Sequence, residues 1–142
     1  MIKIRAATSE DAPAITALLD ALGYPDTESF IEQRMAQLLA HPDAVLRVAV
    51  DGERVVGVIL LHFIPQLALP GDFCRISYLC VAEAVRSQGV GARLEAHAVQ
   101  LARERGCDRI ELHCHARRAD AHRFYLRQQY RESPRYFLKS LR

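Results

Sequence analysis

The chain has 142 residues, of which half are hydrophobic and a quarter are charged, and its formal net charge is only +2. These numbers suit one domain spanning residues 1–142 and give no support to strong nucleic-acid binding. No apolar run has the length of a membrane span, no signal peptide is visible, and the four cysteines form no C-x-x-C pair, so we expect a cytoplasmic protein with reduced thiols.

The first elements predicted are a strand and a helix. Residues 2–5 alternate between apolar and charged side chains, as in a half-buried strand. Ser9, followed by Asp11 and Pro13, is typical of a helix start, and Gly23 is typical of a helix end.

A second helix and a β-hairpin follow. Asp26 or Thr27 is expected to cap the helix. Residues 45–50 and 54–63 are rich in β-forming residues and flank Asp51-Gly52, which is a strong hairpin signal. The second strand of this pair is apolar on both faces, which predicts a central strand that is covered on both sides.

Strands and helices alternate in the rest of the chain. They are expected as a strand at 75–81, a helix after a glycine turn and ending at Gly106, a strand at 108–114, a helix at 119–129 and a strand at 136–139. This order predicts an α/β (α+β) fold with a mixed sheet and helices on both faces. The last strand lies at a sheet end, where an exposed edge could pair across a homodimer.

The glycine turn at 86–91 is the strongest functional signal. It reads Arg86-Ser87-Gln88-Gly89-Val90-Gly91 and lies between a strand and a helix. The first N–H groups of a helix have no intrahelical partner, and together with the helix dipole they bind phosphate. Gly89 and Gly91 allow close backbone approach and Arg86 adds charge. We therefore predict a cofactor that carries a pyrophosphate.

Two common phosphate-binding motifs do not match this turn. The run from Gly89 to Leu94 has the first two glycines of a Rossmann fingerprint but not the third. A Walker A loop requires Gly-Lys-Ser/Thr, which the chain does not contain.

Two motifs in this order resemble the GCN5-related N-acetyltransferase (GNAT) family. The glycine turn corresponds to the family's cofactor motif, and the downstream run from Ala121 to Phe124 and Tyr125 corresponds to its second motif. The resemblance covers nearly the whole chain and implies a mostly antiparallel mixed sheet of six to seven strands, with acetyl-CoA as co-substrate. Residues 120–127, followed by Tyr130, also resemble aminoalkylphosphonate N-acetyltransferases, which acetylate small amines that bear a phosphonate.

The resemblance also assigns site residues. It places the pantetheine arm of coenzyme A along the fourth strand, where a backbone N–H polarises the thioester carbonyl. It makes Tyr125 both a cofactor contact and the general acid for the leaving thiolate. The cofactor-binding residues implied are Leu79, Cys80, Val81, Arg86, Ser87, Gln88, Gly89, Val90, Gly91, Ala92 and Tyr125.

The general base is less clear than the acid. The acidic residue that the narrower group carries on the fourth strand falls at Tyr78, which is instead a candidate hydroxyl contact to substrate. An amine substrate arrives mostly protonated, because its pKa is about 10.4, so a group must accept its proton. The candidate bases are His62, His113 and His115, with Glu83 expected to face solvent.

Three further features leave alternatives open. His113 and His115 would share one face of a strand, but no further ligand completes a metal site, so we expect none. A basic cluster (Arg117, Arg118 and Arg123) has three readings: contact with the 3′-phosphate of the cofactor, contact with an anionic substrate, or exposure to solvent. Residues 22–30 are expected to cover the acceptor.

We predict an acetyl-CoA-dependent N-acetyltransferase in which the primary amine of a small molecule attacks the thioester directly in a ternary complex. An acetyl-cysteine route through Cys80 or Cys114 lacks a group that would activate a thiolate. The alternatives are a protein lysine or N-terminal acetyltransferase, and a non-catalytic acyl-CoA sensor.

Overall fold

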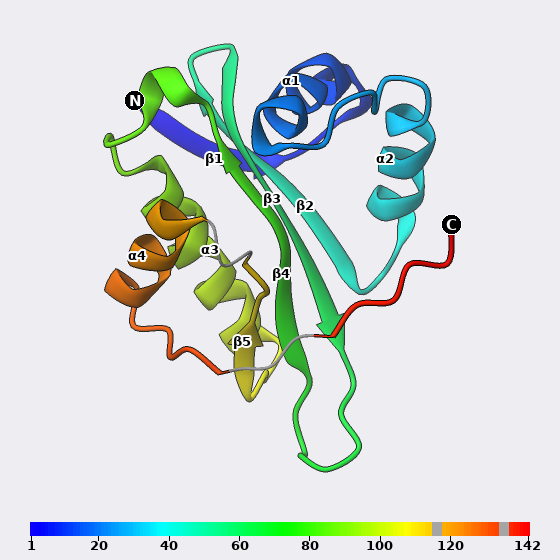
Figure 1. Ribbon diagram of the computed structural model, residues 1–142, viewed down its shortest axis with the longest axis vertical. Coiled ribbons are helices and arrows are strands. Elements are labelled where there is room, and N and C mark those ends of the chain that lie inside the picture. The colour runs from blue at the N-terminus through cyan, green and yellow to red at the C-terminus, as the bar shows by residue number, and fades with distance from the viewer. Residues whose placement is uncertain (115–117, 134–136) are drawn as a thin grey trace. The chain divides into compact units, whose positions relative to one another are not determined.

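Five strands form one sheet in the order β1-β2-β3-β4-β5 among the residues that the structure describes (Figure 1). They are β1 (Ile2–Ala6), β2 (Ala44–Asp51), β3 (Arg54–Ile64), β4 (Phe73–Val81) and β5 (Arg109–Glu111). The first four pair antiparallel with their neighbours, and β5 runs parallel to β4. The mixed, mostly antiparallel sheet is confirmed, with fewer strands than the predicted six to seven.

This computed structural model describes residues 1–114, 118–133 and 137–142. The chain divides into two units, Met1–Glu111 and Leu112–Arg142, and the first unit holds the whole sheet. No helix in the described ranges is both long and apolar enough to cross a membrane.

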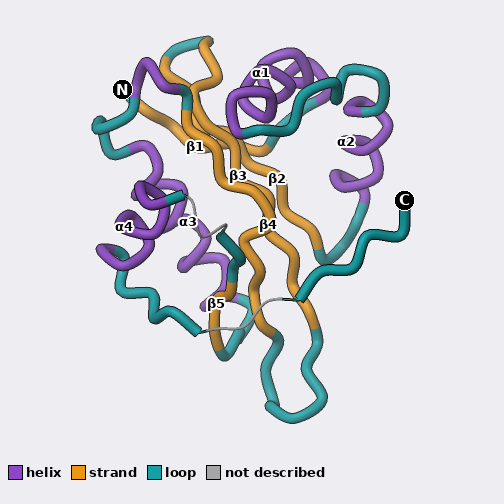
Figure 2. The backbone as a smooth tube through the Cα atoms, viewed as in Figure 1, coloured by secondary structure: helices purple, strands orange, loops and turns teal. Residues whose placement is uncertain are grey.

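Helices cover both faces of the sheet within the first unit, as predicted (Figure 2). The helices α1 (Ala12–Leu22) and α2 (Ile31–Ala40) pack on one face, where Ile15, Leu18 and Met35 join buried residues of β2, β3 and β4 in one core cluster. On the other face lies α3 (Val90–Glu104), with Val90 and Leu94 fully buried.

The central position of β3 is also confirmed. Its residues 56–61 are all buried, because alternate side chains enter the cores on opposite faces. Gly57 lets α3 approach closely, since a Cβ at this position would lie 3.0 Å from Leu94 Cδ1. The hairpin turn before β3 contains Gly52 with φ +64°, as the Asp-Gly signal predicts.

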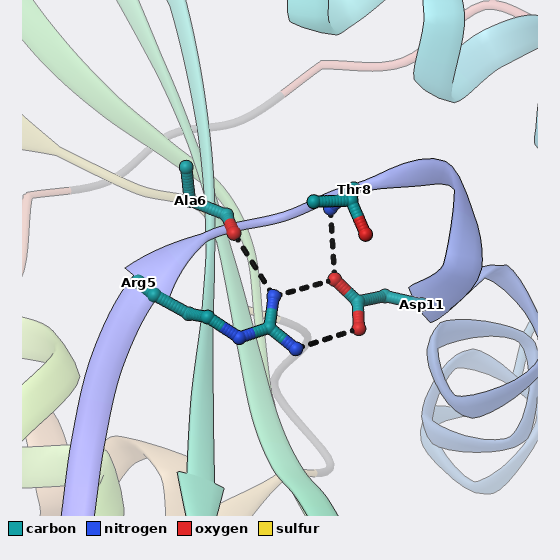
Figure 3. A network of polar contacts seen from close by, with 4 residues as sticks. All are labelled: Arg5, Ala6, Thr8 and Asp11. Atoms are coloured by element: carbon teal, nitrogen blue, oxygen red, sulfur yellow. Dashed lines mark hydrogen bonds and ion pairs between the residues drawn. The ribbon is translucent and has the colours of Figure 1, made fainter. Parts of the chain in front are cut away.

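An ion pair joins β1 to the start of α1 (Figure 3). Arg5 donates to both carboxylate oxygens of Asp11 at 2.8 and 2.9 Å, and the backbone N–H of Thr8 donates to the same carboxylate at 2.8 Å. These bonds hold the pKa of the buried Asp11 below its usual value, although burial opposes them. Residues Ser9–Asp11 form a 3-10 turn, so the helix starts at Ala12 rather than at Ser9.

Gly23 ends α1 in the left-handed conformation with φ +112°, as predicted. The predicted cap of the second helix is wrong. Residues 28–30 form a turn, and α2 begins at Ile31 with Phe30 at the cap position. Thr27 contributes its carbonyl to the N–H groups of Phe30 and Ile31, and its buried hydroxyl has no partner among the described residues.

The predicted strand at 108–114 is too long, and the predicted strand at 136–139 does not form in its described residues. Only Arg109–Glu111 of the first segment forms a strand. Residues 137–139 form none, and Tyr136 lies outside the described residues. The edge pairing that suggested a homodimer therefore has no strand to carry it in the described part of this segment.

The second unit contains α4 (Ala119–Arg127), which ends two residues before the predicted end. Gln129 has φ +70° and turns the chain back, so that the N–H of Tyr130 donates to the carbonyl of Tyr125 at 3.0 Å. The Tyr125 ring consequently lies between Phe124 and Tyr130, with ring centroids 5.1 and 5.5 Å away.

Candidate functional site

The glycine turn connects β4 to α3 on the surface of the first unit. A short 3-10 helix (Glu83–Val85) precedes it, and residues 86–89 are all exposed. Gly89 has φ +78° and Ser87 has φ +75°, although the left-handed region is disfavoured for a residue with a Cβ. Two left-handed residues so close together curve the backbone, and such curvature turns successive N–H groups toward one point.

The start of α3 leaves backbone donors open. The first intrahelical bond at this end joins the N–H of Arg93 to the carbonyl of Gly89. The N–H groups of residues 90–92 precede that bond, and no side chain in the described part of the chain caps them. A 15-residue helix places the positive end of its dipole at the same point. This geometry fits a pyrophosphate, and exposed Arg86 adds a positive charge beside it.

One edge of β4 is open for a second interaction. The strand β5 pairs only with Phe73, Cys74 and Arg75, so no described strand pairs with residues 76–81 on that side. The pairing of β4 with β5 therefore ends before Leu79 and Val81. An extended ligand could follow this edge and reach the glycine turn at its end.

A β-bulge at Ser77 sets which side chains of β4 face α1 and α2. Leu60 pairs with Tyr78, but Leu61 pairs with Ile76, so Ser77 is one extra residue on β4. After the bulge, Cys80 lies in the core under α1 and α2. Tyr78 lies opposite Leu60, which belongs to that same core.

Tyr78 contacts the connection between α1 and α2. Its ring lies 5.5 Å from that of Tyr24 in an edge-on arrangement. Burial, followed by Tyr24 and Cys80, raises the pKa of Tyr78. The phenol is consequently neutral at pH 7 and can donate a hydrogen bond, but it is a poor proton acceptor. That residues 22–30 cover the acceptor stays a prediction.

His62, a candidate base, lies on the same face of the sheet. Its Nδ1 is 2.6 Å from the Ser77 hydroxyl. Burial lowers the pKa of His62, and the nearby His41 and Arg75 lower it further, so the imidazole is neutral at pH 7. No motif in the sequence singles out Ser77 or Arg75. Both come beside His62 only through the register of β3 and β4, which no local pattern reveals.

His113 and Tyr125 belong to the second unit. His113 is exposed and lies two residues beyond the end of β5, so the predicted strand does not extend to it. His115 and Arg117 lie outside the described residues. Tyr125 is half-buried beside its two aromatic neighbours.

Two arginines of the basic cluster lie within the described ranges. Arg118 is exposed, and Arg123 forms an ion pair with Asp120 on the same helix.

All four cysteines are free thiols. Burial raises the pKa of Cys114 and brings that of Cys74 to about 12. No group of three or more potential metal ligands occurs in the described ranges.

The mixed sheet with helices on both faces, and the glycine turn between β4 and α3, form the fold of a GNAT acetyltransferase. The acetyltransferase (GNAT) family model matches residues 12–130, and the chain belongs to this family. The predicted family and the predicted N-acetyltransferase activity are thereby confirmed.

Individual relatives agree with this assignment. The chain is 36% identical over 141 residues to the aminoalkylphosphonate N-acetyltransferase of Salmonella typhimurium, covering 98% of this chain and 91% of the relative. Its fold is similar to that of a transcriptional regulator from Bacillus halodurans C-125 (TM-score 0.91, 25% identity, 99% of this chain and 100% of the other). It is also similar to a structure from Agrobacterium tumefaciens str. C58 (TM-score 0.88, 24% identity, 97% and 99%).

Proposed function

We propose that this protein transfers the acetyl group of acetyl-CoA to the primary amine of a small molecule, by direct attack of the amine in a ternary complex. The observation that carries the proposal is the continuity of the open β4 edge with the open start of α3. The two together offer one path for an extended ligand that ends in a pyrophosphate. The 36% identical relative is named for aminoalkylphosphonates, which makes these amines the first acceptors to test.

We assign the cofactor contacts as follows. The N–H groups of residues 90–92 and the side chain of Arg86 hold the pyrophosphate. The backbone of Leu79, Cys80 and Val81 lines the pantetheine arm, and one of its N–H groups donates to the thioester carbonyl. Acetyl-CoA, when bound, supplies an activated acyl carbon. Loss of one such donor typically slows a reaction by about 10²–10³-fold.

The chemistry needs a proton acceptor and a proton donor. The amine nitrogen bonds to the thioester carbon, the C–S bond breaks, and the amine gives up its extra proton. His113 is our first candidate to accept that proton, and Tyr78 is a candidate hydroxyl contact to the acceptor. Tyr125 donates a hydrogen bond to the leaving thiolate, since full transfer from a phenol of pKa about 10 to a thiolate of about 8.5 is uphill.

The four free thiols support the expectation of a reducing, cytoplasmic compartment. The raised pKa of Cys114 keeps its thiol protonated, which argues against an acetyl-cysteine intermediate at this residue. The homodimer stays a prediction, which the mass in solution would test.

An amine panel tests the proposed function. Purified protein is mixed with acetyl-CoA and either aminoalkylphosphonates, neutral alkylamines or peptides, and released CoA is measured. We expect steady CoA release with at least one small amine. Acetylation of peptides alone would favour a protein acetyltransferase. Binding of acetyl-CoA without release with any acceptor would favour a sensor.

A further inference from the structure

We propose that His62, Arg75 and Ser77 form a subsite that binds an anionic group of the acceptor, a phosphonate in the first acceptors to be tested. The inference rests on the proposed function, because it names the part of the site that would recognise such an acceptor. It concerns the acceptor only and leaves the proposed cofactor contacts unchanged.

The strand register brings the three side chains together. His62 on β3 lies directly opposite Arg75 on β4, and side chains at opposed positions point to the same face of a sheet. The bulge at Ser77 turns its hydroxyl toward His62, with Nδ1 and Oγ 2.6 Å apart. Arg75 and Ser77, two residues apart on β4, and His62 on β3 therefore bring together three groups that can donate hydrogen bonds.

Arg75 is the central group because no described carboxylate neutralises its charge. No described carboxylate forms an ion pair with it, and its buried Nε has no hydrogen-bond partner among the described residues. Its guanidinium instead lies 5.4 Å from the ring of Phe73, which restrains the side chain. A buried donor without an acceptor is unfavourable, and the fork of an arginine matches the oxygens of a phosphonate.

The electrostatic surroundings favour an anion. His41 and Arg75 both lower the pKa of His62, so the imidazole has two basic neighbours and senses no carboxylate that opposes them. A bound dianion would reverse this effect, since a nearby negative charge stabilises the imidazolium. The subsite is consequently poorly suited to a second ammonium group and well suited to an anion.

The distance along β4 fits a short acceptor. Ser77 precedes Cys80 by three residues, which corresponds to about 10 Å at the rise of a β-strand. An aminoalkylphosphonate with two carbons between nitrogen and phosphorus is shorter than this distance. The Ser77 side chain, its hydrogen bond to the phosphonate and the contact between amine and thioester have to span the remainder. Tyr78, with Tyr24 against it, lies between these two points.

The kinetic test compares Arg75→Gln with Arg47→Gln. Arg47 is a half-buried arginine of the same sheet that faces α3, where it lowers the pKa of His97. We expect Arg75→Gln to raise the KM for 2-aminoethylphosphonate about 10–100-fold, as the loss of a charged hydrogen bond would. The KM for acetyl-CoA and for propylamine stays at the wild-type value, and Arg47→Gln changes none of the three.

The outcomes separate this proposal from the proposed function. Acetylation of 2-aminoethylphosphonate with the same KM in wild type and Arg75→Gln overturns the subsite and leaves the activity standing. If the wild type acetylates no amine, the proposed function fails. Calorimetric binding of 2-aminoethylphosphonate to the CoA complex then decides the subsite: binding that Arg75→Gln removes supports it, and unchanged or absent binding overturns it.

A measurement on the wild type guards against misfolding of the variant. The ring proton signal of His62 is followed by NMR as a function of pH, with and without 2-aminoethylphosphonate. We expect the ligand to raise the midpoint of this titration by at least about half a pH unit. An unchanged midpoint at saturating ligand overturns the proposal.

Discussion

At the scale of single residues, Tyr125 tests the proposed chemistry most directly. We expect Tyr125→Phe to slow kcat by about 10–10³-fold, because the leaving thiolate loses its proton or hydrogen-bond donor. The affinity for acetyl-CoA should change little, since the proposed pyrophosphate contacts do not include Tyr125. Steady-state kinetics and calorimetry measure the two quantities.

The matched control is Tyr130→Phe, which removes a hydroxyl from the neighbouring ring of the same unit. It should leave kcat within about threefold of the wild type, in line with a side chain that donates nothing to the reaction. Equal turnover in the wild type and in Tyr125→Phe would remove Tyr125 from the mechanism.

Asp11 is a second residue whose role can be isolated. Asp11→Asn keeps the shape of the side chain but removes the charge that Arg5 pairs with (Figure 3). We expect the free energy of unfolding to fall by about 1–3 kcal/mol at pH 7, the range for losing charged hydrogen bonds at a buried group. Urea unfolding measures this change, and Glu10→Gln at the exposed neighbouring position should have almost no effect.

The same carboxylate predicts an acid dependence. The pKa of Asp11 is lowered in the folded state, so its stabilising contribution is complete above the unfolded value of about 4 and is lost as the pH falls through the folded pKa. The difference in unfolding free energy between wild type and Asp11→Asn should therefore shrink when the pH is lowered from 7 to below 4. A difference that is constant over this range would contradict the assignment.

At the scale of elements, the turn before α3 can be compared with the β-hairpin turn. Gly89 and Gly52 both have positive φ, and a Cβ at either position would meet no atom within 4 Å. Alanine at either position should therefore cause only backbone strain, about 1–2 kcal/mol. Gly89→Ala should in addition weaken acetyl-CoA binding, because the strain is relieved by turning N–H groups away from the pyrophosphate.

Thermal unfolding and calorimetry on the two variants measure both effects. Gly52→Ala is the control, since it carries the same strain at the far end of β2. The same loss of acetyl-CoA affinity in both variants, or no loss in either, would contradict the role of the glycine turn.

At the scale of the whole molecule, acetyl-CoA should stabilise the fold against heat. A ligand that binds only the native state adds about 2.7 kcal/mol at one hundred times its Kd. For a chain of this size we expect the Tm to rise by roughly 5–10 °C. Pantetheine at the same concentration lacks the pyrophosphate and should give a much smaller rise, so equal shifts would argue against pyrophosphate binding at the start of α3.

Local signals in the sequence predicted much of the fold. The hairpin at Gly52, the end of α1 at Gly23, the covered strand β3 and the order of β4, glycine turn and α3 were all correct, because each depends on the preferences of a few adjacent residues. The family and its activity followed from two motifs that are each contiguous in the chain.

Tertiary structure decided the features that depend on strand register and on contacts between distant residues. The bulge at Ser77 places Tyr78 against Tyr24 and brings Arg75 opposite His62, and neither pairing leaves a mark in the local sequence. The early end of β5 likewise depends on its pairing with β4, not on its own apolar residues. The sequence by itself therefore predicted the family, its activity and the proposed acetyl donor, whereas the proposed acceptor subsite emerged only once the strands were paired. The proposed phosphate contacts belong to one contiguous turn, but the proposed acceptor contacts are side chains that the sheet brings together.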